Sequence, residues 1–225
     1  MKQRMHRRLA LIIGGAAYLG SVVAAGPANL STLSPAKNCY NRSFDLKSPN
    51  SEHWIIAHES DAAFVFTRNW PSESDSDVAL VQLFELPPQL NDAQFESLVR
   101  KSIQADENPT RFDIQKSDIN ATRERKFPCL RYQATSIDHG APTIFRRKRS
   151  LLFQLQAIYC RYPGNPGRGF TVSFSHRGET ELPTFNVEAQ SFIEHVRVAK
   201  VLTPPPADPT RDMPVPPEDV DPMPE

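Results

Sequence analysis

The chain has 225 residues, of which 39% are hydrophobic and 23% charged, and its 26 basic and 26 acidic side chains leave no formal net charge. This length accommodates one domain with extensions, or at most two small domains. The zero net charge disfavours a dedicated nucleic-acid-binding protein, which would carry a strongly basic domain. The low apolar share, together with 21 prolines, indicates that part of the chain does not enter a packed core.

The first 25 residues have the three-part layout of a secretory signal peptide. Residues 1–8 carry four basic side chains and no acid, residues 9–25 are uncharged, and Val23-Ala24-Ala25 supplies small residues for cleavage after Ala25. The alternative is an uncleaved anchor in the inner membrane formed by residues 9–25, but this stretch contains three glycines and falls short of the ~20 residues of a spanning helix. We therefore expect a periplasmic or secreted protein, which also disfavours a nucleic-acid partner.

The other end of the chain is a proline-rich acidic tail. Residues 203–225 contain nine prolines and six acids, with one arginine. A segment of this composition buries too little apolar surface to order itself, so a disordered tail is expected. Between the two ends we expect an N-terminal linker at residues 26–43 and a single α+β domain at residues 44–202.

Within this domain the sequence predicts two helices. Asn91 and Gln94 form a capping box, and apolar residues then recur on one face up to Ile103, which predicts a helix at 91–106. A second helix is expected at 186–198. The expected strands are Trp54–Glu59, Ala62–Thr67, Val78–Leu86, Arg111–Lys116, Phe127–Asp138, Ser150–Cys160 and Phe170–Arg177. This order predicts an α+β fold with a largely antiparallel sheet flanked by helices.

Two cysteines indicate the register of the central hairpin. Cys129 and Cys160 lie on successive predicted strands, and a symmetric hairpin that pairs them also pairs Leu130 with Tyr159. This register collects apolar side chains on one face, whereas a slip of one residue would mix the two faces. We predict a disulfide between Cys129 and Cys160, which export permits, with two buried free thiols as the alternative. Cys39 is then a free thiol, a link between chains, or the true partner of one of the other two.

Extension of this sheet to the strand at 170–177 predicts a polar face. A turn near residue 165 places Gln156 beside Ser175 and Ile158 beside Ser173. Such a face is either solvated, covered by a helix, or a flat recognition surface for a protein partner. The residues predicted to share it are Arg131, Gln133, Thr135, Gln154, Gln156, Ser173 and Ser175.

The sequence contains no recognisable catalytic, metal-binding or cofactor-binding motif. The six histidines show no HExxH spacing, the three cysteines form no CxxC, and no glycine run continues into a phosphate-binding loop. We expect no metal, no cofactor and no enzymatic activity. The residues that an unrecognised small hydrolase could use are His58, Glu59 and Cys39. Ser175 and His176 are neighbours on one strand and point to opposite faces, so they cannot act as a nucleophile and base. His176 falls on the apolar face of this strand and is expected to be a packed or edge histidine.

A basic run lies at the tip of the central hairpin, and a shorter one lies near residues 123–126. These runs are either solvated loops or sites for an anionic lipid surface, an acidic protein partner or the chain's own acidic tail. The residues of the tip are Arg146, Arg147, Lys148 and Arg149.

The order of short strands, helix, long hairpin, strand and closing helix resembles the PsbP-like α/β/α sandwich, which bacterial DcrB-like envelope proteins share. The stretches at 157–163 and 171–177 also look like a pattern found in small exported bacterial proteins. The resemblance covers residues 44–200 and implies a non-catalytic, protein-binding accessory domain of the cell envelope. It also implies an alternative, an immunity protein that neutralises a periplasm-targeted type VI secretion toxin. The small hydrolase is a second alternative.

Overall fold

The computed structural model describes residues 32–70, 74–87, 89–141 and 149–198. The predicted signal peptide and the proline-rich tail lie outside these residues. In chain order the elements are β1 (Asn38–Tyr40), β2 (Phe44–Lys47), β3 (Trp54–Ser60), β4 (Ala63–Asn69), β5 (Ser76–Glu85), α2 (Asp92–Asp106), β6 (Phe112–Thr122), β7 (Cys129–Ala141), β8 (Arg149–Arg161), β9 (Arg168–Gly178), α3 (Phe185–His195) and β10 (Arg197–Val198).

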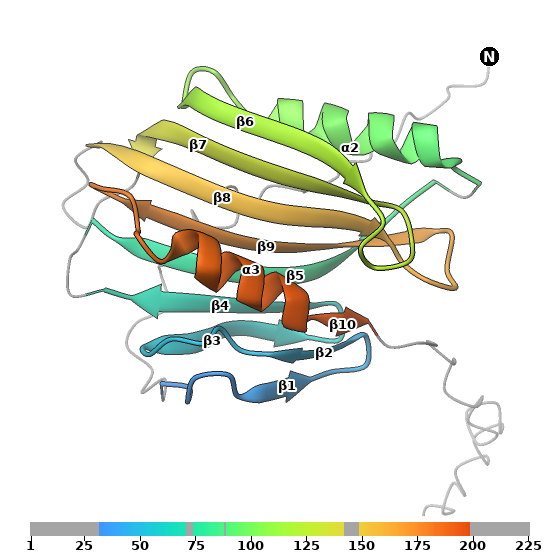
Figure 1. Cartoon of the computed structure of the whole chain (residues 1–225), viewed down its shortest axis with the longest axis horizontal. Helices are drawn as coiled ribbons and strands as arrows, with labels where there is room; N and C mark the ends of the chain where they lie inside the picture. Colours follow the sequence, from blue (N-terminus) through green and yellow to red (C-terminus); the bar gives the residue numbers. More distant parts are fainter. Residues whose placement is uncertain (1–31, 71–73, 88, 142–148, 199–225) are drawn as a thin grey trace, which may run out of the picture.

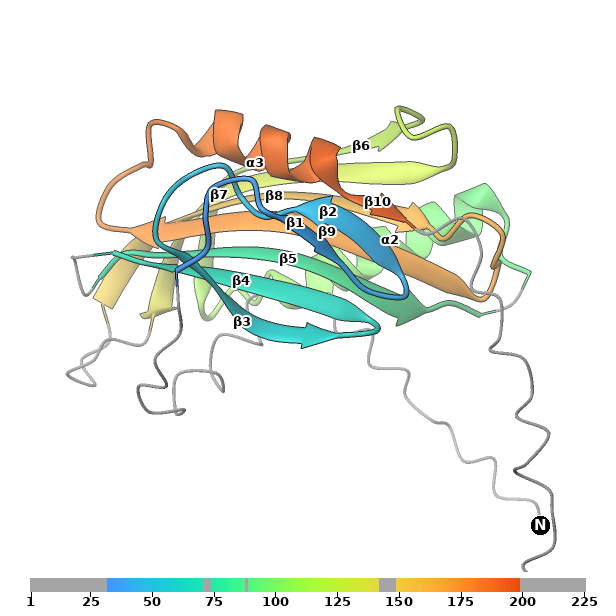
Figure 2. The same cartoon turned by 90° about the horizontal axis from the view of Figure 1, so that it is seen from below.

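A seven-stranded antiparallel sheet with the order β3-β4-β5-β9-β8-β7-β6 forms the centre of the molecule (Figure 1). A second sheet contains β1, β2 and β10. Helix α3 and the small sheet lie on one face of the large sheet, and α2 lies on the other (Figure 2). One apolar core fills the space beneath α3 and the small sheet, and another fills the space beneath α2. The predicted α+β architecture is therefore confirmed.

The first helix begins as the sequence predicts. The backbone N–H of Gln94 donates to the side chain of Asn91 at 2.9 Å, and the backbone N–H of Asn91 donates back to the Gln94 side chain at 3.0 Å. Phe95, Val99 and Ile103 form the buried face of α2. The capping box thus satisfies two N–H groups that have no partner within the helix, and the apolar face holds the helix on the sheet.

The central hairpin has the predicted register. Cys129 pairs with Cys160 and Leu130 with Tyr159, and the same register continues to the pair of Asp138 with Leu151. A disulfide joins Cys129 and Cys160, whose Cα atoms are 4.2 Å apart. The prediction of a cross-strand disulfide is confirmed, and Cys39 is a free, buried thiol.

The predicted register between the last two long strands is wrong by one residue. Ser175 pairs with Leu155 and Ser173 with Ala157, because the turn closes where the N–H of Tyr162 donates to the carbonyl of Arg168 at 2.9 Å. The period-2 pattern of β9 does not reveal this slip, because both faces of the strand are covered. The apolar residues of β9 pack under α3, and the two serines face the α2 side.

Three element boundaries also differ from the prediction. Strand β1 lies inside the stretch 26–43 expected as a linker, where Asn38 pairs with Lys47, so the folded part starts earlier than residue 44. Strand β6 extends to Thr122, and its mostly exposed polar residues gave no strand pattern. Helix α3 ends at His195 rather than at residue 198, because Val196 is extended and Arg197–Val198 pairs with β2.

A buried polar cluster ties α3 to the large sheet. Arg68 of β4 contacts Asp77 of β5 at 2.5 Å and Glu188 of α3 at 3.0 Å. His176 of β9 contacts Asp77 at 2.7 Å and is only 4% exposed, which confirms that it is a packed histidine. Because these charges are withdrawn from water, they stabilise the fold only while all of them are paired.

Candidate functional site

The residues of the predicted polar face do not form one surface. Gln154 and Gln156 lie beneath α3, where Gln154 accepts from the N–H of Leu182 at 2.9 Å and Gln156 donates to Asn186 at 2.7 Å. Ser173 and Ser175 lie on the opposite face of the sheet, as the corrected register requires. On the α3 side of the sheet the structure brings together five of the seven predicted residues, because Gln133 of β7 pairs with Gln156 of β8 and Thr135 pairs with Gln154, with Arg131 next along β7.

Arg131 and Gln133 line a groove between α3 and β7, which we call the α3 groove. Its volume is about 790 Å³, within the range of ligand pockets of roughly 300–1,000 Å³. The apolar residues of the groove are Phe127, Ile193, Val196 and Val198, and its charged residues are Glu124, Arg125, Arg131, Glu194 and Arg197.

Arg125 holds one wall of the α3 groove in place. Its guanidinium donates to the backbone carbonyls of Val196, at 2.6 Å, and Ile193. These carbonyls lie at the C-terminus of α3, where carbonyl groups lack partners within the helix and a positive charge is favourable. Burial lowers the pKa of Arg125, because removing its positive charge from water costs free energy. The hydrogen bonds to α3 offset this cost.

Arg131 forms part of the charged rim of the α3 groove. It contacts Glu124 at 2.8 Å and donates to the side chain of Gln190 at 3.0 Å. The hydrogen bond from Arg131 lowers the pKa of Glu124, so this carboxyl is ionised at neutral pH. Gln133 is exposed beside this pair. The groove therefore combines apolar contact area with charges of both signs.

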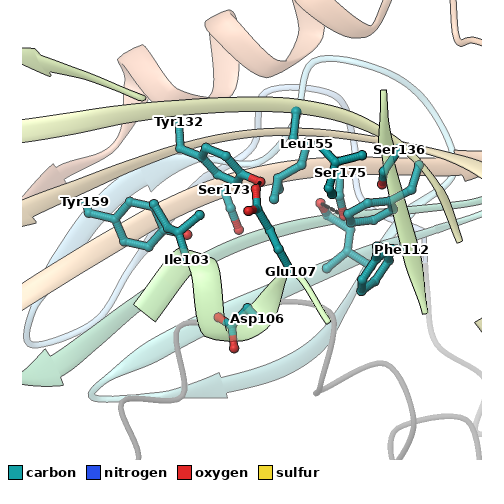
Figure 3. Close-up of a pocket in the computed structure, with 14 residues that line it drawn as sticks. Ile103, Asp106, Glu107, Phe112, Tyr132, Ser136, Leu155, Tyr159, Ser173 and Ser175 are labelled. Atoms are coloured by element: carbon teal, nitrogen blue, oxygen red, sulfur yellow. Dashed lines mark hydrogen bonds between the residues drawn. The ribbon is translucent and has the colours of Figure 1, made fainter. Parts of the chain in front are cut away.

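Ser173 and Ser175 line a second hollow, which lies between the C-terminal end of α2 and the large sheet (Figure 3). We call it the α2 pocket. Its interior measures about 50 Å³, and it opens to the surface. Small side chains produce the hollow: Ala134, Ser136, Ser173 and Ser175 occupy sheet positions where larger residues would fill the space. Its other lining residues are Val78, Ile103, Asp106, Glu107, Phe112, Ile114, Tyr132, Phe153, Leu155 and Tyr159.

Two carboxylates and two tyrosines give the α2 pocket its polar part. The hydroxyl of Tyr132 donates to Glu107 at 2.5 Å, as Figure 3 shows. Burial raises the pKa of Asp106 to about 6. Burial also raises the pKa of Tyr132 and of Tyr159, and the negative charges of Glu107 and Asp106 add to both shifts. Both hydroxyls are therefore neutral donors at physiological pH.

The sequence did not single out Asp106 and Glu107, although it contained one signal. Acidic residues at the C-terminal end of a helix are unfavourable, because the helix dipole places negative charge there. No basic residue occupies the last turn of α2. An acidic pair in this position indicates a local cost to stability.

The residues proposed for a hydrolase are not arranged for catalysis. Burial raises the pKa of the Cys39 thiol, whereas a nucleophilic cysteine requires a lowered pKa. His58 and Glu59 are exposed on β3. His176 contacts Asp77 through Nδ1, but its Nε2 lies 3.2 Å from the carbonyl oxygen of Thr180 rather than beside a hydroxyl nucleophile.

The remaining predictions concern the basic tip of the hairpin, metal binding and membrane-spanning helices. Arg146, Arg147 and Lys148 of the basic tip lie outside the described residues, and Arg149 is the first residue of β8. Within the described part of the chain, no group of three or more His, Cys, Asp or Glu side chains is placed to hold a metal ion. Over the same part, no helix is both long and apolar enough to cross a membrane.

No protein-family model matches the sequence, and no curated protein matches it. Several solved structures are similar to it in fold. LpqN of Mycobacterium tuberculosis, described as involved in cell envelope biogenesis, is 15% identical, with a TM-score of 0.44 over 76% of this chain and 92% of LpqN. The Ran-binding protein Mog1p of Saccharomyces cerevisiae is 10% identical, with a TM-score of 0.41 over 76% of this chain and 96% of Mog1p.

The cyanobacterial PsbP of Synechocystis sp. PCC 6803 is 15% identical, with a TM-score of 0.39 over 78% of this chain and 96% of that protein. PsbP is thus among the solved structures to which this chain is similar. These likenesses concern the course of the chain alone. What this chain binds has to be argued from its own surface.

Proposed function

We propose that this chain is an exported, non-catalytic, protein-binding domain of the bacterial cell envelope, and that its partner binds in the α3 groove. The observation that carries the proposal is the composition of this groove. Protein interfaces combine an apolar centre with a polar rim and are enriched in arginine. The α3 groove has this composition, with the partly buried Phe127 and Val198 among its apolar residues and Arg131 and Arg197 among its charged ones.

The disulfide supports the exported location. Disulfides persist in oxidising compartments and are rare in the cytosol. The bond between Cys129 and Cys160 lies in the core beneath α3, so it belongs to the folded structure rather than to an exposed pair of thiols. It agrees with the expected signal peptide at residues 1–25 and cleavage after Ala25.

The groove also favours a binding role over chemistry. The guanidinium of Arg125 is engaged by the C-terminus of α3, and Arg131 and Glu124 contact each other. Paired charges of this kind can form directional contacts with a partner. Because they are paired, they do not act as a free nucleophile or base. The proposed class includes both a general accessory factor and an immunity protein.

Site-specific photo-crosslinking tests this function in the cell. A photoreactive residue is placed at Gln133, which is exposed in the α3 groove, and a matched one at Glu59, which is exposed on the edge strand β3 of the large sheet. We expect a discrete crosslinked protein from position 133 and none of the same mass from position 59. The charge reversal Arg197→Glu on the groove rim should reduce the yield from position 133. Equal crosslinking from both positions, or none from position 133, would contradict the proposal.

A further inference from the structure

The α2 pocket combines an apolar interior with negative charge at one end. Its walls are formed by side chains such as Val78, Phe153 and Leu155, and two carboxylates lie where α2 ends. None of the described residues that line it is basic. The pocket therefore has the polarity of a site for an amphiphile, and its charge excludes an anionic head group.

The end of α2 adds to this negative charge. The C-terminus of a helix behaves as about half a negative charge, which is normally balanced by a basic side chain in the last turn. In α2 this turn contains no basic residue and ends in Asp106, followed by Glu107. Three sources of negative potential thus meet at one end of the pocket.

Burial makes this arrangement costly. Desolvation raises the pKa of Asp106 to about 6, and no basic neighbour contributes to the shift. The titratable groups that share its surroundings are Glu107 at the end of α2, Tyr132 on β7 and Tyr159 on β8, all of which are acids. Two arginines, Arg111 and Arg177, lie over the rings of Phe112 and Phe153 in the pocket wall, and both contact the carboxylate of Asp138. A bound cation would offset the charge that the protein itself leaves unbalanced.

The interior determines the size of the apolar part of the ligand. A single water requires roughly 10–15 Å³ of such space, so an interior of about 50 Å³ admits only the end of a short alkyl chain. The floor at Ser173 and Ser175 is only partly buried, so the apolar part can extend along β9 toward the surface. The proton of the Tyr132 hydroxyl is already donated to Glu107, so this oxygen can only accept from an ammonium group, which is itself a donor.

We propose that the α2 pocket binds a small amphiphilic amine, with its apolar chain between Leu155 and Phe153 above the serines and its ammonium group beside Asp106 and Glu107. The site lies on the opposite face of the large sheet from the α3 groove. The proposal therefore stands independently of the protein partner, and its failure would leave that function untouched.

Titration of the full mature chain with hexylamine, hexanol and hexanoate, followed by NMR, tests the proposal. At pH 7.5 we expect hexylammonium to bind about tenfold more tightly than hexanol, as one ion pair in a partly buried site allows, and hexanoate to bind most weakly. At pH 5 the preference for the amine over the alcohol should fall from about tenfold to about twofold, because only about a tenth of the Asp106 carboxyl is then ionised. Absence of binding, or equal binding of amine and hexanoate, overturns the proposal.

Variants separate the two parts of the site. Asp106→Asn should abolish the preference for the amine while hexanol still binds, and the control Asp45→Asn, on the exposed face of β2, should change neither. Ser175→Leu should fill the hollow and weaken amine and alcohol alike. If that variant does not fold, Ala134→Val fills the same space from β7. A folded pocket-filling variant with unchanged binding, or Asp106→Asn with an unchanged preference, contradicts the proposal.

Discussion

Asp106 shows how one residue can lower stability in a structure whose other buried charges have partners of opposite charge. Its carboxyl is partly buried at the negative end of α2, without a cation beside it. From the sequence it resembles any solvated acid at the end of a helix. Its cost depends on the strands beneath it, which are far away in the chain, so sequence patterns did not reveal it.

Asp106→Asn should stabilise the protein at high pH. The folded carboxyl has a pKa of about 6 against 3.8 for a free one, so the folded state binds the proton more tightly and its stability falls as pH rises between these values. With allowance for solvent screening, we expect the variant to be more stable than wild type by about 1 kcal/mol at pH 8 and equal to it at pH 3. Urea unfolding at both pH values measures this difference, and a gain that persists at pH 3 would refute the assignment.

Arg125 illustrates the opposite case, a charge that a helix end stabilises. Arg125→Ala removes two charge-assisted hydrogen bonds to α3 and leaves the carbonyl of Ile193 with only the long bond from the N–H of Val196, at 3.4 Å. We expect a loss of about 2 kcal/mol in the free energy of unfolding. The matched control is Arg123→Ala in the same turn, whose exposed contact with Asp92 at 3.3 Å is a surface ion pair of about 0–1 kcal/mol. Equal losses in the two variants would show that Arg125 has no special role.

At the scale of elements, local patterns predicted those structures whose stabilising contacts are close in sequence. The capping box located the start of α2, and the cysteine pair with its apolar face located the central hairpin. The strand β9 was misaligned by one residue because both of its faces are buried, so alternation did not distinguish them. The end of α3 was placed too late, since the buried Val196 continues the helical period although its backbone is extended.

The hairpin provides a test at this scale. Reduction of the disulfide between Cys129 and Cys160 should lower the free energy of unfolding by about 3 kcal/mol, because the bond constrains the unfolded chain. Denaturant unfolding with and without reductant measures the effect. The variant Cys39→Ala should show the same response to reductant, since Cys39 is not bonded to another cysteine. A response that disappears in Cys39→Ala would mean that the cysteines pair differently.

For the whole molecule, the fold class and layers were predictable, but the two hollows were not. Each hollow is formed by residues from distant elements: the α3 groove joins β7 to the end of α3, and the α2 pocket joins the end of α2 to five strands of the large sheet. Of the predicted polar face, Arg131 and Gln133 reach the groove, while Ser173 and Ser175 line the pocket on the other side. The sequence therefore indicated relevant residues but assigned them to one surface instead of two.

The most direct test of the central claim is the affinity of the crosslinked partner, once purified, for three forms of the mature chain. Wild type is compared with Arg197→Glu, on the rim of the α3 groove, and with Arg42→Glu, a charge reversal of an exposed arginine between β1 and β2. We predict that Arg197→Glu weakens binding by about tenfold or more, because a reversed charge on the rim opposes the partner, and that Arg42→Glu leaves the affinity unchanged. Equal affinity of all three forms would contradict the claim that the α3 groove binds the partner.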